Sequence, residues 1–239
     1  MILEWLLTSI DVPRAHDIGT GISWHARVMI LAWGVLSPSA IIIARFYKIL
    51  PKQDWPKELD WRFWWKYHWM INVLAIILSV IGLVVILNSK SNSELLGLHK
   101  VTGYIVLSFA FMQGMSGMFR GTKGGPTKPA KDGSLNGDHY NMTAWRLMFE
   151  RVHKTVGYAT LIIIVICILD GLWMTNAPRW MWLAIIVWWI MLIVTSIYLQ
   201  RRGRAIETYQ AIWGPDNIHP GNKLPPVGWY VRRPGDDID

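Results

Sequence analysis

The chain of 239 residues contains a single cysteine, Cys167, so no disulfide can form within it. A lone cysteine also excludes the C-x-x-C-H motif, and with it the covalent attachment of a c-type haem. The sequence contains no H-E-x-x-H motif, which removes the commonest zinc-hydrolase pattern. Cys167 itself lies in an apolar run, where a small packing role is expected.

Charge is also missing from several long stretches. The chain is 52% hydrophobic with 16 tryptophans, and blocks of roughly 20 residues carry almost no charge, which is long enough to cross a bilayer core of about 30 Å. Only helices satisfy every backbone amide within such a segment, so we predict an all-α membrane protein with five transmembrane helices in contact with membrane lipid. The expected spans are residues 24–46, 63–87, 97–119, 150–174 and 180–199.

The remaining Lys and Arg residues are distributed unevenly. Most of them follow the first, third and fifth spans, and few lie on the other side of the membrane. The sparse group is Arg14, Arg27, Lys90, Lys100 and Arg179. By the positive-inside rule we expect the N-terminus outside and the C-terminus in the cytoplasm, in a plasma membrane such as the bacterial inner membrane. Topology thus explains the net charge of +8, and no nucleic-acid binding is needed.

This topology divides the chain into three parts. Residues 1–22 form an extracytoplasmic N-terminal segment, residues 23–200 a transmembrane domain, and residues 201–239 a cytoplasmic tail. Because the tail is polar and interrupted by proline, we expect it to be extended.

Each of the first four spans carries a histidine near its own N-terminal end: His25, His68, His99 and His153. Ionisable rings inside a membrane are costly and usually mark a function, although a single one can simply be hydrogen-bonded between helices. Consecutive spans run in opposite directions, so His25 and His99 should lie near the outer face and His68 and His153 near the inner face. Two facing imidazoles on each side are what a six-coordinate b-type haem requires.

A repeated motif supports this interpretation. His99 and His153 each begin an H-K-x-x-G-Y string, in which Gly103 and Gly157 lie one helical turn after the histidine and on the same face. A glycine there lets a flat ring approach the backbone, although glycine also serves ordinary close packing of membrane helices.

A metal ion is the main competing ligand. Zinc prefers four ligands in a tetrahedron, whereas each face offers two histidines, with Asp170 as the intramembrane carboxylate. A proton-transfer role for Asp170 remains open. The other histidines, His16, His139 and His219, lie in termini or loops and are expected to be solvated.

At these residues the chain resembles the cytochrome b561 family, on the branch of ferric-chelate-reductase-like and DOMON-linked members. The strings "WHARVMILAWGVLSPSAIIIARFYK" and "LHKVTGYIVLSFAFMQGMSGMFRG" carry the resemblance. It implies two non-covalent b haems, with His25 paired to His99 and His68 to His153. Lys100 and Lys154, each next to a ligand, are the candidates for contact with haem propionates. About 20 residues precede the first span, so no DOMON domain is expected before it.

The resemblance implies electron transfer across the membrane between a donor and an acceptor on opposite faces. The partner outside could be a separate redox protein, and a second copy of the chain is a further candidate partner. A quinone-linked oxidoreductase is the alternative, with Ser37, Asn72 or Gln113 lining the quinone site. A membrane assembly protein whose histidines only pack is the third.

Overall fold

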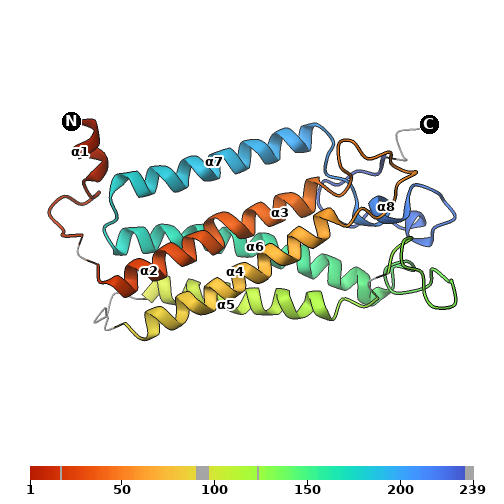
Figure 1. The fold of residues 1–239 in the computed structure, drawn as a ribbon, viewed down its shortest axis with the longest axis horizontal. Coiled ribbons are helices and arrows are strands. Elements are labelled where there is room, and N and C mark those ends of the chain that lie inside the picture. The colour runs from red at the N-terminus through yellow and green to blue at the C-terminus, as the bar shows by residue number, and fades with distance from the viewer. Residues whose placement is uncertain (17, 90–96, 123, 235–239) are drawn as a thin grey trace. The chain divides into compact units, whose positions relative to one another are not determined.

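The computed structural model describes residues 1–16, 18–89, 97–122 and 124–234. Lys90 and Lys123, two of the charges that entered the topology prediction, lie outside these ranges. Within the ranges the chain is helical and forms only three isolated bridges in place of a sheet, which confirms the all-α prediction. The elements in chain order are α1 (Ile2–Leu7), α2 (Thr20–Met29), the π-helix η1 (Ile30–Leu36), α3 (Ser37–Phe46), α4 (Phe63–Leu87), α5 (Gly97–Met118), α6 (Ala144–Met174), α7 (Arg179–Arg201), α8 (Thr208–Trp213) and the 3-10 helix η2 (Pro220–Lys223) (Figure 1).

Four segments of the described chain are long and apolar enough to cross a membrane, where the sequence predicted five. They are Thr20–Phe46, which joins α2, η1 and α3, and the helices α4, α6 and α7. The predicted third span forms α5, which has 22 residues. It contains Thr102, Gln113 and several Gly and Ser residues, and it is not among these four segments.

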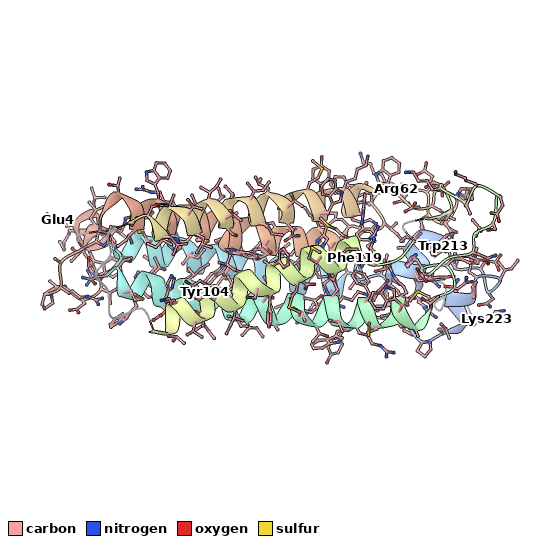
Figure 2. The ribbon with its side chains drawn as sticks, turned by 90° about the horizontal axis from the view of Figure 1, so that it is seen from below. Glu4, Arg62, Tyr104, Phe119, Trp213 and Lys223 are labelled. Carbon is pink, nitrogen blue, oxygen red and sulfur yellow. The ribbon has the colours of Figure 1, made fainter. Side chains whose placement is uncertain are left out.

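Small side chains occupy the helix faces that pack inward. On α4 the buried residues are Ala75, Ser79 and Gly82, spaced one turn apart. On α7, by contrast, Ile185 is the one buried residue among those described. Membrane helices associate through small residues because lipid offers large apolar side chains an equally good environment. This is consistent with the many large apolar side chains that are exposed, among them Tyr104 on α5, which is 46% exposed (Figure 2).

The first span contains a π-helical turn directly before Pro38. Proline has no N–H to donate to the carbonyl of Gly34, four residues earlier, so that carbonyl needs another partner. The indole N–H groups of Trp188 and Trp189 supply it, donating to Gly34 O at 3.0 and 3.3 Å. The carbonyl that Pro38 leaves without a helical donor is therefore satisfied by side chains of α7.

The chain divides into two compact units. Unit 1 comprises Met1–Ser39, Ile71–Phe111 and Tyr158–Thr195, and unit 2 comprises Ala40–Met70, Met112–Gly157 and Ser196–Asp239. Unit 1 contains His25 and His99, and unit 2 contains His68 and His153, so each unit holds one of the predicted pairs.

The C-terminal segment is folded, contrary to the prediction that it is extended. All six residues of α8 are buried, and Tyr209, Trp213 and Val227 join Met142 in a hydrophobic core of unit 2. Glu207, which is 2% exposed, accepts hydrogen bonds from both Arg233 and the backbone N–H of Val227. A buried carboxylate must be paired, and its pairing fixes the segment. Trp213 and Lys223 of this segment lie at one end of unit 2 (Figure 2).

Candidate haem-binding sites

Site 1 lies in unit 1 and consists of His25 on α2 and His99 on α5. Their ring centroids are 6.1 Å apart and the ring planes differ by 77°. The Nδ1 atom of His25 lies 2.9 Å from the carbonyl oxygen of Gly82, and that of His99 lies 3.0 Å from the carbonyl oxygen of Cys167. The structure thus brings these two histidines together, and their role as haem ligands stays a prediction.

Site 2 lies in unit 2 and consists of His68 on α4 and His153 on α6. Their ring centroids are 6.3 Å apart and the planes differ by 73°. The Nδ1 atom of His68 lies 3.1 Å from the carbonyl oxygen of Ala40, and that of His153 lies 3.3 Å from the hydroxyl oxygen of Ser116. The two sites therefore repeat the same arrangement on different helices.

In all four histidines, Nδ1 lies within hydrogen-bond distance of an oxygen atom that can accept a hydrogen bond. This fixes the tautomer with the hydrogen on Nδ1 and leaves a lone pair on Nε2, which is how metal-ligating histidines are usually held. All four rings are only partly buried. A common tautomer with the hydrogen on Nδ1 is the form that metal ligation through Nε2 would require.

The separation of the rings fits a metal ion between them. An imidazole nitrogen binds a metal at about 2 Å and lies about 1 Å from its ring centre, so two imidazoles on opposite sides of one metal have centres about 6 Å apart. The observed 6.1 and 6.3 Å match this value. The residues present therefore fit bis-histidine ligation of a haem iron, and the fit holds at both sites.

The two glycines of the repeated motif have different surroundings. A Cβ atom on Gly103 would meet only the Sγ atom of Cys167, at 3.9 Å, so the backbone there borders open space. A Cβ atom on Gly157 would meet Nε2 of Gln113 at 3.2 Å. Gly103 thus leaves room beside site 1, as the sequence indicated, whereas Gly157 makes room for a neighbouring side chain.

A third glycine, which the sequence did not single out, supports site 1. A Cβ atom on Gly171 would lie 3.0 Å from Cε1 and 3.3 Å from Nδ1 of His99. The His99 ring therefore packs directly on the backbone of α6, which holds it toward His25. Asp170, the neighbouring residue, is close enough to act electrostatically on His99.

The two lysines proposed for propionate contact differ in their environment. Lys154 forms an ion pair of 2.7 Å with Glu150 and donates to the carbonyl oxygen of Val227 at 2.8 Å. Lys100 is exposed. Their role toward haem propionates stays a prediction.

Unit 2 also contains a group of buried charges that the sequence analysis missed. Glu150 is 4% exposed and binds Arg146 and Lys154, while Lys48 is 7% exposed and donates to the carbonyl oxygens of Arg45 and Ile206. Burial, together with the nearby charges of Lys154 and Arg45, lowers the pKa of Lys48 to about 7. The i, i+4 spacing of Arg146, Glu150 and Lys154 was the available signal.

His139 is buried, which corrects the prediction that it is solvated. It is 3% exposed, its Nδ1 atom accepts a hydrogen bond of 3.0 Å from Trp213, and burial lowers its pKa to about 3. His139 is therefore neutral, and because Nδ1 is an acceptor the hydrogen is on Nε2, 3.7 Å from Glu150. His16 is partly buried, and its Nδ1 atom lies 2.7 Å from the carbonyl oxygen of Thr175.

A helical membrane protein whose histidines face in pairs has the arrangement expected of proteins that bind haem without covalent attachment. Comparison with known proteins agrees: the family model for eukaryotic cytochrome b561 matches residues 24–128, which include three of the four histidines. A cytochrome b561, DM13 and DOMON domain-containing protein of Arabidopsis thaliana is 24% identical over 205 residues, covering 83% of this chain and 20% of the relative. The chain thus spans about a fifth of that relative's length. No solved structure matches this chain significantly.

Both matches agree with the resemblance to the cytochrome b561 family that the histidine pattern indicated. The chain is an integral membrane protein with long apolar helices.

Proposed function

We propose that this protein is a transmembrane b-type cytochrome that holds two b haems, one at site 1 and one at site 2, and that it passes electrons from one face of the membrane to the other. The observation that supports the number two is the duplication of the site: two histidine pairs with ring separations of 6.1 and 6.3 Å, each within its own unit. When bound, haem supplies an iron that accepts and releases single electrons.

The side chains of the chain hold and insulate this iron. The four Nδ1–H groups fix the ring orientations, so each Nε2 is aimed before binding and little reorganisation accompanies a change of charge. Apolar residues in the core of unit 1, such as Val106 and Ile168, are buried and exclude water, and the low polarity that results would influence the haem potential.

The distribution of Lys and Arg residues supports one orientation of the protein in the membrane. The three basic segments that follow the first, third and fifth spans all belong to unit 2. By the positive-inside rule we place the site 2 end at the cytoplasmic face and the N-terminus outside. The plant relative is named for a DOMON domain as well as for cytochrome b561. We therefore propose that an extracytoplasmic redox protein or domain exchanges electrons with site 1.

The residues suggested for a quinone site have partners within the protein. Ser37 donates to the side-chain oxygen of Asn72 at 3.1 Å, and Gln113 donates to the carbonyl oxygen of His153 at 2.7 Å. Interhelical hydrogen bonds thus account for them, and among the residues that the structure describes no contact favours the quinone-linked alternative over direct electron transfer.

The experiment places the purified protein in sealed vesicles with ferricyanide trapped inside and an impermeant reductant outside. We expect reduction of the trapped ferricyanide by the wild type, and none by His99→Leu or His153→Leu, because each lacks one ligand of the relay. Protein-free vesicles measure leakage. A wild-type protein that purifies with haem but leaves the trapped ferricyanide oxidised would show that electrons do not cross.

A further inference from the structure

The acceptor for the Nδ1–H of His153 differs in kind from the other three. His25, His68 and His99 each face a backbone carbonyl, at 2.9, 3.1 and 3.0 Å. His153 faces the hydroxyl of Ser116, at the longer distance of 3.3 Å. A backbone carbonyl is the same whatever the side chain, whereas this hydroxyl depends on the identity of one residue.

The orientation of the hydroxyl is fixed by a second bond. Ser116 Oγ donates to the carbonyl oxygen of Gln113 at 3.0 Å, which engages its hydrogen. Since a hydroxyl has one hydrogen and two lone pairs, the oxygen can only accept from Nδ1–H of His153. The direction of the Ser116–His153 bond is therefore determined.

Gln113 holds the same histidine by its backbone. Its amide donates to the carbonyl oxygen of His153 at 2.7 Å, and the absence of a side chain at Gly157 leaves space for that amide. Gln113 and Ser116, one turn apart on α5, thus hydrogen-bond to His153 at two places, its carbonyl oxygen and its ring.

The strength of the hydrogen-bond acceptor at Nδ1–H would affect the reduction potential of an iron bound at Nε2. A stronger acceptor at Nδ1–H gives the imidazole more negative character, so Nε2 donates more electron density and stabilises ferric over ferrous iron. A hydroxyl at 3.3 Å is a weaker acceptor than a carbonyl at 2.9 to 3.1 Å. Site 2 is thereby biased toward the reduced state by a bond that site 1 does not share.

We propose that Ser116 is a positioning residue that sets the reduction potential of the site 2 haem through its hydrogen bond to His153, with Gln113 fixing its geometry. This inference rests on the proposed function, because it requires that site 2 binds haem. It predicts a graded series in which the potential falls as the acceptor at position 116 becomes stronger.

The test is a potentiometric titration in the His25→Leu/His99→Leu background, so that only the site 2 haem contributes to the spectrum. Ser116→Ala removes the acceptor and should raise the potential, while Ser116→Asn offers an amide carbonyl and should lower it. Each shift should correspond to a two- to tenfold change in the ratio of reduced to oxidised haem, about 18 to 59 mV for one electron. Ser116→Thr keeps the hydroxyl and should restore the wild-type value.

Ser79→Ala is the matched control, since Ser79 is a buried serine whose hydroxyl donates to the carbonyl of Ala75 one turn earlier. It should leave the potential unchanged. Equal potentials for the Ala, Ser and Asn proteins, or the reverse order, would overturn the role of Ser116 while leaving the two-haem proposal intact. Loss of all haem from the background variant with Ser116 intact would instead contradict the proposed function itself.

Discussion

Glu150 and Lys154 form an ion pair of 2.7 Å on α6, with Lys154 immediately following the site 2 ligand His153. The other carboxylate oxygen of Glu150 binds Arg146 at 3.0 Å, and Lys154 also donates to the carbonyl oxygen of Val227. The helix that carries the ligand is thus joined to the C-terminal segment through one buried carboxylate and one lysine.

Neutralising that carboxylate should destabilise the protein strongly. In Glu150→Gln the buried guanidinium of Arg146 loses its counter-charge, and breaking a buried pair from one side typically costs about 3–5 kcal/mol. We expect a marked fall in the thermal midpoint of the haem-loaded protein in detergent, followed by loss of the haem spectrum. Glu4→Gln, at an exposed ion pair of α1, is the control and should unfold like the wild type. Equal midpoints for the two variants would refute the buried-pair account.

The buried Lys48 predicts how stability depends on pH. Its pKa in the folded protein is about 7, below its ordinary value of 10.5, so between these two values the unfolded chain binds more protons than the folded one. Stability should therefore rise as the pH rises from 7 to 10. Lys48→Met should lose this part of the rise, whereas Lys52→Met, at an exposed site, should retain it. The measurement is the thermal midpoint across that range, and a Lys48→Met profile parallel to the wild type would exclude the effect.

Gly171→Ala should damage site 1 and spare site 2. The added Cβ atom would lie 3.0 Å from Cε1 of His99, close enough to push the ring away from His25. We expect about half of the bound haem to be lost on purification. Gly117→Ala, where a Cβ atom would meet no atom within 4 Å, should keep the full amount. Full haem content in Gly171→Ala would mean that the ring can shift without losing its ligand position.

The π-helix of the first span predicts a coupling between two helices. Replacing both Trp188 and Trp189 by Phe leaves the carbonyl of Gly34 without its two indole donors, a loss of about 1–3 kcal/mol. With Pro38→Ala present, the new backbone N–H can bond Gly34 O, so the same tryptophan substitutions should cost less. A thermal-unfolding double-mutant cycle measures the difference. Strict additivity would show that the indoles do not serve this carbonyl.

Which histidines share a face could be predicted from the sequence, because it depends on chain direction alone. Helices that alternate in direction put His25 on the same face as His99, and His68 on the same face as His153. How closely the rings of each pair approach depends on packing, which the sequence does not show.

Contacts between distant residues could not be predicted in this way. The Nδ1 partners of the ligands are backbone carbonyls or a serine hydroxyl, and neither has a sequence signal. The tail was predicted to be extended because its prolines and polar residues suggest a loop, yet Glu207 and Arg233 lie in a buried ion pair 26 residues apart. A histidine in a loop is usually solvated, but His139 is covered by Trp213 of the folded tail, which donates a hydrogen bond to it.

The most direct test of the two-site account is the haem content of paired double variants. In His25→Leu/His99→Leu both substitutions fall in site 1, so one haem per chain should remain. In His25→Leu/His68→Leu each site loses a ligand, so haem should be absent or nearly so. Haem per chain, quantified after purification, should be two in the wild type, one in the first variant and none in the second. One haem retained by the second variant and none by the first would contradict the pairing of His25 with His99 and of His68 with His153.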